Sequence, residues 1–380
     1  MDFSWSADVR QRHRAARTLG RSLATDIDAR DRAGEFSLSA WNALGDAGLL
    51  ALFVPPALGG GGLSLLDTVY IHEGLASGCD DAGLLMGAHA HMFGCLPPLL
   101  AGCDEAQKAR WLAPLARGEQ ICALAMTESE TGSDAFSMST TATRDGDEYV
   151  ISGEKVWVTN GPRADWVLVF ARTGQGAAMQ ALSAFMVAGD APGLCRHPDV
   201  PRLGLRTCDI GPLSFDEVRV PASHRIGAEG GGAQLFLTAM EWERIGIMTA
   251  ALGSMDRLLS RSLRHVRRPR EGRPPLKSHQ AVTHRLAELR QDLESSRLML
   301  YHAAWKVSEG RRASVESALA KLTASEAHFM AALTALRSFG AAGLVEGSGI
   351  ERALRDAACG LIYSGTSDIQ RNVVAGMMGA

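Results

Sequence analysis

The sequence predicts an α+β protein in which a helical region comes first, a β-domain follows and a second helical region ends the chain. Two observations predict this order. Apolar residues recur at helical spacing before residue 121 and after residue 233, and short β-rich runs separated by turn residues fill the stretch between them. A glycine-rich segment at 227–232 marks the second change. We therefore expect an N-terminal α-helical domain at 1–121, a central β-domain at 122–232 and a C-terminal helical domain at 233–380.

The first region has the signals of capped helices. Ser37 precedes an apolar-rich segment that ends at Gly48, which is the pattern of a helix with a serine N-cap and a glycine stop. Residues 64–78 place apolar side chains at helical spacing. The glycines at 59–62 interrupt the pattern and predict a loop.

The middle region has a different residue pattern, in which β-rich runs are separated by turn residues such as Asp145-Gly146 and Asn160-Gly161. Several short runs at this spacing predict a β-barrel or a sandwich. The expected strands are Ile121–Met126, Tyr149–Ile151, Val156–Thr159, Trp166–Ala171, Ala184–Val187 and Leu213–Val220.

The helical period returns in the last region. Val282, Leu286, Leu289 and Leu293 follow the spacing of one helix face, and the stretch from Ala313 to Phe339 is rich in alanine and leucine with few helix breakers. We expect long helices here.

The composition narrows the class of protein. The chain has 380 residues and a formal net charge of −3, so no global charge indicates nucleic-acid binding. Its seven cysteines include no C-x-x-C pair, which argues against a disulfide framework and a zinc site, and His89 with His91 lacks a metal-ligand pattern. We see no signal peptide and no run of about 18 apolar residues, so we expect a cytoplasmic protein without a membrane span or a metal.

Two segments of the middle region carry groups that suit a cofactor. Residues 127–134 follow a strand and combine small hydroxyl residues with a glycine, so their backbone N–H groups can hold a phosphate or a polar ring edge. Trp157 and Thr159 lie two apart on a strand and face the same side, where an indole can cover a flat ring and a hydroxyl can donate to it. Taken alone, the first segment is better explained as a surface turn, and the second as a core tryptophan beside an edge threonine.

Together with other segments, these two resemble the acyl-CoA dehydrogenase family. The resemblance is carried in the right order by Ala123–Asp134, Ile151–Gly161, Phe215–Pro221, Arg355-Asp-Ala and Ile362–Arg371. It implies an α-domain, a β-domain and a C-terminal four-helix bundle, with FAD as cofactor. It also implies a homotetramer built from dimers, an acyl thioester of CoA or of an acyl-carrier protein as substrate, and a separate electron acceptor such as an electron-transfer flavoprotein.

The resemblance also implies which residues hold FAD. Trp157 would pack on the isoalloxazine and Thr159 would donate near N5. The residues expected around the flavin and its phosphate arm within one chain are Met126, Thr127, Gly132, Ser133, Trp157, Thr159, Tyr363, Thr366 and Asp368. Those expected to reach the FAD of a neighbouring subunit are Leu276, His279, Gln280, Arg337 and Ala341.

The catalytic base is the most informative departure from the family pattern. Many members have a glutamate where this chain has Ser364, and a serine hydroxyl without a partner cannot remove an α-proton at neutral pH. One branch, similar to isovaleryl-type enzymes, places the glutamate on a helix just before an arginine, and Glu243-Arg244 matches it. We expect Glu243 to be the base, the Ser364 backbone N–H to hold the thioester carbonyl and Arg244 to steady either group. Glu241 lies on a different helix face.

Two further departures concern the contact between subunits. The family's Arg-x-x-Phe-Gly stretch has Pro269 and Gly272 here in place of the arginine and the phenylalanine, so that contact with FAD is altered. Arg337 replaces a glutamine near the pyrophosphate and still favours a phosphate. The arginines of 261–273 indicate either a solvated helix end and loop or a docking place for phosphates.

Three functions remain open at this point. The first is α,β-dehydrogenation of an acyl thioester, in which Glu243 removes the α-proton and the β-hydride passes to flavin N5. The second is a flavin monooxygenase on the same fold, which would not need such a base. The third is a non-catalytic subunit of a heteromeric dehydrogenase.

Overall fold

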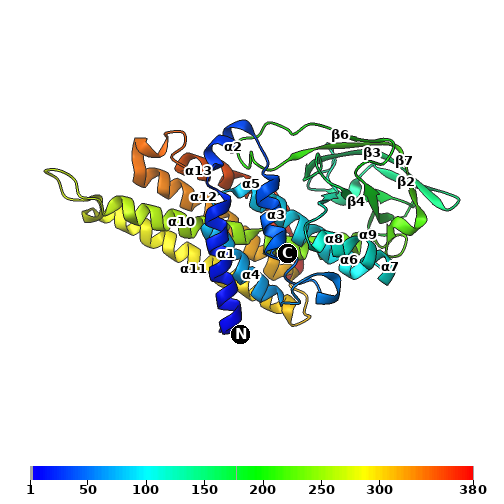
Figure 1. Ribbon diagram of the computed structural model, residues 1–380, viewed down its shortest axis with the longest axis horizontal. Helices are drawn as coiled ribbons and strands as arrows, with labels where there is room; N and C mark the ends of the chain where they lie inside the picture. Colours follow the sequence, from blue (N-terminus) through cyan, green and yellow to red (C-terminus); the bar gives the residue numbers. More distant parts are fainter. Residues whose placement is uncertain (1–2, 177, 380) are drawn as a thin grey trace.

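The computed structural model describes residues 3–176 and 178–379. A bundle of helices and a sheet lie at opposite ends of an elongated molecule, and two helices project from the bundle as an arm (Figure 1). The helices before the sheet are α1 (Ala7–Leu23), α2 (Ile27–Ala33), α3 (Leu38–Asp46), α4 (Leu65–Gly78), α5 (Ala82–His89), α6 (Leu96–Gly102), α7 (Glu105–Gln107) and α8 (Ala113–Ala116).

The predicted helix starts in this region are confirmed. The Ser37 side chain accepts a hydrogen bond from the Ala40 N–H (3.2 Å) at the start of α3, and Ser64 caps α4. Glycines let α1 and α4 pack closely, since a Cβ on Gly78 would lie 2.1 Å from the Arg17 carbonyl oxygen. The helical half is therefore fixed by caps and by close backbone contact.

A π-helical turn, η2 (Ala90–Cys95), joins α5 to α6. The combined run Ala82–Gly102 is long and apolar enough to cross a membrane, but 83% of its most apolar window is buried inside the protein. It is the central core helix, and both ends of the molecule pack against it. A π-turn widens a helix locally and often marks a functional site.

The middle of the chain forms one mixed sheet with the strand order β6-β7-β3-β2-β4-β5-β8, and β1 pairs with β4 in parallel. The strands expected at Tyr149–Ile151 and Val156–Thr159 are one strand, because β3 passes through Gly153 with irregular pairing to β7 on either side. The strands are β1 (Cys122–Ala125), β2 (Thr141–Asp145), β3 (Glu148–Thr159), β4 (Trp166–Arg172), β5 (Leu182–Ala188), β6 (Leu194–Arg196), β7 (Ile210–Pro221) and β8 (Arg225–Ile226).

The last part of the chain is helical, as predicted. Helices α10, α11 and α12 pack against one another, α14 packs on α12, and α9 meets both α12 and the π-turn η2. One apolar core joins these helices to α5 and to one face of the sheet. The helices are α9 (Gly232–Gly246), α10 (Met248–Val266), α11 (Gln280–Ser308), α12 (Ser314–Phe339), α13 (Ile350–Cys359) and α14 (Ser367–Met378).

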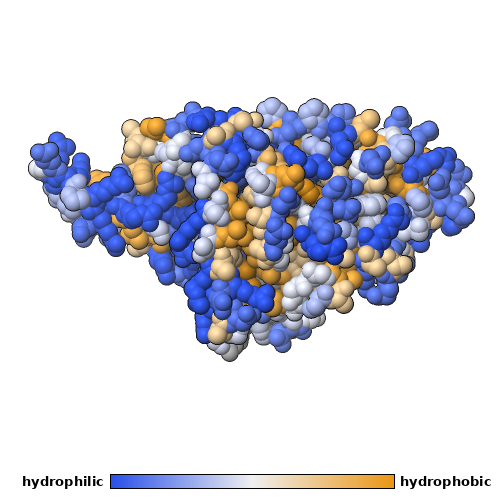
Figure 2. Space-filling view, viewed as in Figure 1, coloured by the Kyte–Doolittle hydropathy of each residue, from blue (hydrophilic) through white to orange (hydrophobic). Residues whose placement is uncertain are grey.

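The arm is formed by the end of α10, the start of α11 and the segment between them, and it extends away from the sheet (Figure 1). Polar side chains cover it (Figure 2). Arg267, Arg268, Arg270 and Arg273 are all exposed there. The arginine-rich segment is thus the solvated tip of two helices within one chain.

Candidate functional site

Glu243 and Ser364 meet although 121 residues separate them in the chain. The Ser364 hydroxyl donates a hydrogen bond of 2.5 Å to Glu243 Oε1. Glu243 comes from the last turn of α9 and is only 9% exposed, and Ser364 lies in the turn that precedes α14. The two positions singled out in the sequence therefore form one site.

Gly94 makes room for the Glu243 carboxylate. A Cβ on Gly94 would lie 2.8 Å from Glu243 Oε2, which is closer than real Cβ contacts allow. Gly94 belongs to the π-turn η2, and its neighbour Phe93 packs with similar closeness on Gly246 of α9. The carboxylate thus lies between the π-turn on one side and the Ser364 turn on the other.

The electrostatics of this site suit a base. Burial raises the pKa of Glu243, while the Ser364 hydrogen bond and the nearby Arg244 partly oppose the shift. Arg244 donates from Nε to the Ser364 carbonyl oxygen (3.4 Å). Glu241 points elsewhere, since it accepts a hydrogen bond from the Ala313 N–H at the start of α12. Of the two glutamates Glu241 and Glu243, it is therefore Glu243 that is buried beside Ser364.

The turn that holds Ser364 has an unusual backbone. Ser364 has φ 54° and Gly365 has φ 88°, so two successive residues are left-handed. Gln370 stabilises the turn, because its amide donates to the carbonyls of Ser364 (3.1 Å) and Gly365 (2.8 Å). No group in the part of the chain that the structure describes accepts a hydrogen bond from the Ser364 N–H. That N–H is available to a ligand.

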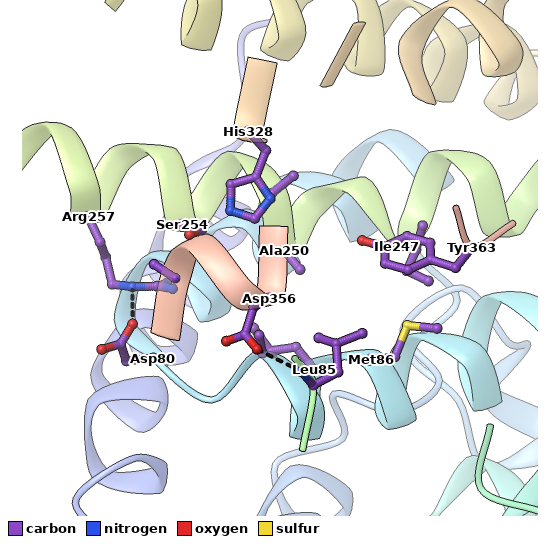
Figure 3. Close-up of a pocket in the computed structure, with 14 residues that line it drawn as sticks. Asp80, Leu85, Met86, Ile247, Ala250, Ser254, Arg257, His328, Asp356 and Tyr363 are labelled. Atoms are coloured by element: carbon purple, nitrogen blue, oxygen red, sulfur yellow. Dashed lines mark hydrogen bonds and ion pairs between the residues drawn. The ribbon is translucent and has the colours of Figure 1, made fainter. Parts of the chain in front are cut away.

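The neighbouring expected residues have separate positions. The Thr366 hydroxyl caps α14 by accepting from the Ile369 N–H (3.2 Å). Asp368 is exposed and pairs with Arg371 (2.9 Å). Tyr363 lines a small cavity of about 30 Å³ together with Met86 and Ile247 (Figure 3). Ile247 lies one helical turn beyond Glu243, but Glu243 itself does not line this cavity.

The loop after β1 is held by a buried carboxylate. Glu128 accepts hydrogen bonds from the N–H and hydroxyl groups of Ser139 and Thr140, at 2.6 to 2.9 Å. Lys155 of β3 donates to Glu128 Oε1 (2.9 Å) and to the Met126 carbonyl oxygen (2.9 Å). Burial would raise the pKa of Glu128, but these hydrogen bonds lower it to about 2. The network fixes the loop that contains Thr127, Gly132 and Ser133.

Trp157 lies on the surface beside this loop. Its side chain is 59% exposed and its φ is 57°, at a bulge in the pairing of β3 with β7. Trp157 and Thr159 both lie on the side opposite the buried Val158, as the alternation predicted. The alternative of a core tryptophan is wrong, because the indole is exposed.

The residues around this indole fit a flavin. A large exposed indole leaves a flat apolar face for a ring to cover. The Thr131 hydroxyl is buried without a hydrogen-bond partner in the described part of the chain, and no atom lies within 4 Å of a Cβ on Gly132. Ser133 is exposed and Met126 is buried at the base of the loop. A polar ring edge and a phosphate arm would supply the missing partners.

Five expected FAD residues lie far from Glu243 within the chain. Helix α10 has 19 residues and therefore spans about 28 Å. Glu243 precedes its start, whereas His265 near its end stacks on Phe339 (ring centroids 4.2 Å apart). Arg337 and Ala341 flank Phe339, and Leu276, His279 and Gln280 lie at the arm, where α11 begins. One chain does not bring these five residues to its own Glu243.

The sequence reasoning missed three positions that shape the site. Glu128 is part of the Thr-Glu-Ser motif, but nothing in the motif shows that its carboxylate is buried. Gln370 and Gly94 were not singled out, since neither a helix glutamine nor an isolated glycine in an apolar run shows by itself what it contacts. Only the fold shows what they contact.

Comparison with known proteins identifies the family. Residues 8–119, 123–218 and 230–379 match the N-terminal, middle and C-terminal domains of acyl-CoA dehydrogenase. The chain is 36% identical over 378 residues to an L-prolyl-[peptidyl-carrier protein] dehydrogenase of Pseudomonas fluorescens, which covers 99% of each chain. It is 35% identical over 354 residues to the mitochondrial short-chain specific acyl-CoA dehydrogenase of Bos taurus, covering 93% of this chain and 85% of that one.

Solved structures of similar proteins superpose closely on this chain. The prolyl acyl carrier protein oxidase AnaB superposes with a TM-score of 0.97 at 36% identity, over 99% of this chain and 100% of that one. The structure titled PigA with FAD and proline superposes with a TM-score of 0.97 at 30% identity, over 100% and 99%.

The chain belongs to the acyl-CoA dehydrogenase family. It is an FAD-dependent oxidoreductase that dehydrogenates the CH–CH bond of an acyl thioester. Of the three functions that the sequence left open, dehydrogenation is confirmed.

Proposed function

We propose that Glu243 is the base that removes the α-proton of the acyl thioester. The buried contact between Glu243 and Ser364 carries this proposal. It places a carboxylate whose pKa is raised beside the Ser364 backbone N–H, which has no acceptor among the described residues. The Ser364 hydroxyl orients the carboxylate, and Arg244 holds the Ser364 carbonyl. Bound FAD supplies the acceptor for the β-hydrogen, which leaves as hydride.

The Ser364 N–H is the donor that holds the thioester carbonyl oxygen. As the α-proton leaves, negative charge moves to that oxygen, and a preformed donor in a dry site stabilises it. The left-handed backbone of Ser364 and Gly365, fixed by Gln370, leaves the Ser364 N–H without an acceptor among the described residues. The strained turn therefore has a role in the chemistry.

The flavin lies against Trp157, with Thr159 and the Glu128-supported loop at its edge. Within one chain, the residues that hold it are Met126, Thr127, Gly132, Ser133, Trp157, Thr159, Tyr363, Thr366 and Asp368. Residues of the arm and of the α12 end, Leu276, His279, Gln280, Arg337 and Ala341, reach the FAD of a neighbouring subunit. Within one chain, helix α10, about 28 Å long, lies between these residues and Glu243, and this arrangement supports a homo-oligomer. We propose that the oligomer is a tetramer and that the protein is cytoplasmic.

The substrate is an acyl group carried on a carrier protein, and a prolyl group is the first candidate. The match to an L-prolyl-[peptidyl-carrier protein] dehydrogenase, which extends over 99% of this chain and 99% of that one, supports this. A separate acceptor such as an electron-transfer flavoprotein then takes the electrons.

Anaerobic bleaching of the bound flavin tests the substrate. The purified FAD-loaded protein is mixed with prolyl-carrier protein, butyryl-carrier protein, prolyl-CoA and butyryl-CoA, and the loss of flavin absorbance is followed. Prolyl-carrier protein is expected to bleach the flavin at least about tenfold faster than either CoA ester. Faster bleaching by butyryl-CoA would overturn the carrier-protein proposal and leave the dehydrogenase in place.

A further inference from the structure

Lys321 of α12 is a buried cation that forms no salt bridge in the part of the chain that the structure describes. Its side chain is fully buried, and its Nζ has no hydrogen-bond partner among the residues at 3–176 and 178–379. An unpaired ammonium in a protein interior is costly, and two other buried cations of this chain, Lys155 and Arg30, have carboxylate partners. The position of Lys321 therefore calls for a physical reason.

Lys321 faces the segment that holds the thioester carbonyl in the proposed function. Its Nζ lies over the ring of Tyr363, 5.9 Å from the ring centroid, and Tyr363 is bonded directly to Ser364. Helix α12 packs on both α9 and α14, which flank the Glu243–Ser364 contact. The ammonium thus packs on the residue that directly precedes Ser364, whose N–H is free in the described part of the chain.

Cations and carboxylates both lie around this turn, and the proton transfer moves one negative charge among them. Arg244 and Lys321 are the cations, Glu243 and Asp356 are buried carboxylates that act on Tyr363, and Glu326 on α12 is half-exposed. Burial, reinforced by Arg244, lowers the pKa of Lys321 to about 8, and Glu326 partly opposes the shift. Glu243 becomes neutral when it takes the α-proton, and the substrate oxygen then carries the negative charge. The Lys321 ammonium, packed on Tyr363 next to Ser364, favours the negative charge on the substrate oxygen.

We propose that Lys321 is a positioning residue for this reaction: its buried ammonium, packed on Tyr363, stabilises the enolate that forms at the Ser364 N–H. This inference rests on the proposed function of Glu243 and Ser364. Lys321 acts through Tyr363 and the field of its charge, and it does not touch the substrate.

The test compares K321M with K306M. Methionine has a similar length and no charge, and Lys306 is a bundle lysine that is paired with Glu316 (2.6 Å) away from the site. Two pantetheine thioesters serve as probes: the acetoacetyl thioester ionises to an enolate, and the crotonyl thioester stays neutral. K321M is expected to bind the acetoacetyl thioester about tenfold more weakly at pH 7 while binding the crotonyl thioester unchanged. K306M is expected to bind both as the wild type does.

The pH dependence of stability gives a readout that needs no substrate. Between pH 8 and 10.5 the unfolded chain holds the Lys321 proton that the folded chain has lost, so the wild type gains stability with rising pH. The thermal midpoint of the wild type should therefore rise relative to K321M over this range, and K321M should be at least as stable at pH 7.

Three outcomes would overturn the proposal. Equal loss of affinity for both thioesters would show a steric role, and unchanged affinity for both would show no role. A K321M protein that does not fold or hold FAD would show that the lysine is structural. If the wild type is reduced by no thioester, the proposed function fails, but the pH comparison still decides whether Lys321 is a buried ammonium.

Discussion

At Glu243 the fold combines three features that no single sequence motif contains. The carboxylate is buried, a hydroxyl from a residue 121 positions away orients it, and a glycine in a π-turn leaves space for it. The sequence was sufficient to name Glu243 and Ser364, because the resemblance placed both. It was not sufficient to show that they touch, since side-chain contacts across such a separation depend on how α9 and α14 pack.

Gly94 is predicted to matter through the space that it leaves. In G94A the new Cβ would collide with the Glu243 carboxylate, which must then leave the position it has between Gly94 and Ser364. We expect the rate of flavin reduction by substrate to fall about 10- to 100-fold with FAD still bound, measured by anaerobic stopped-flow absorbance.

The matched control is G376A. Gly376 lies in α14 and no atom lies within 4 Å of a Cβ built there, so its rate should stay at the wild-type value. Equal rates for G94A and the wild type would show that the carboxylate does not need the Gly94 position.

At the scale of elements, the order of helices, strands and helices followed from periodicity and turn residues. Periodicity did not reveal that β3 continues through Gly153 as one strand, because a glycine inside a strand looks like a turn in sequence. It also did not reveal the π-turn of Ala90–Cys95, since this run is apolar and mostly buried, so that an inserted residue shifts no visible apolar face.

The loop after β1 should depend on Glu128. In E128Q the buried Lys155 loses its charged partner, so we expect the free energy of unfolding to fall by about 3 kcal/mol at pH 7 and FAD to bind more weakly. E130Q, at an exposed position of the same loop, should lose neither. Denaturant unfolding and FAD titration measure both effects.

The pH dependence follows from the lowered pKa of Glu128. A carboxylate with a pKa of about 2 in the folded chain and about 4.5 in the unfolded chain contributes stability that is complete above pH 4.5 and is lost as the pH falls towards 2. The stability difference between wild type and E128Q should therefore shrink from pH 5 to pH 3. A constant difference would mean that the Glu128 charge is not what stabilises the loop.

At the scale of the whole molecule, the fold and its three-part order could be predicted because the motifs occur along nearly the whole chain. The boundaries at 121 and 232 remain predictions, since one apolar core connects all parts. The FAD role expected for the residues at the arm and at the end of α12 requires the proposed assembly, because helix α10, about 28 Å long, lies between them and Glu243 in their own chain.

Mixed oligomers test whether FAD is shared between subunits. R337A and W157A chains should each bind FAD at least about tenfold more weakly, because one loses a phosphate contact and the other the ring contact. If Arg337 serves the neighbour's FAD, an oligomer that contains both variants regains tight sites that pair an intact Trp157 with an intact Arg337. FAD titration of the mixture, with R12A as the control variant, should then show a tight fraction. Uniformly weak sites would place Arg337 and Trp157 at the same chain's FAD.

The assignment of Glu243 as the base is tested most directly by the rate of anaerobic flavin reduction in E243Q, measured with the thioester that bleaches the wild type fastest. Glutamine keeps the size of the side chain and can still meet Ser364, but it cannot accept the α-proton. We expect the rate to fall at least about 100-fold while the absorbance of bound FAD stays unchanged, and E346Q, at an exposed loop position, to react at the wild-type rate. Reduction of E243Q at the wild-type rate would contradict the assignment of Glu243 as the base.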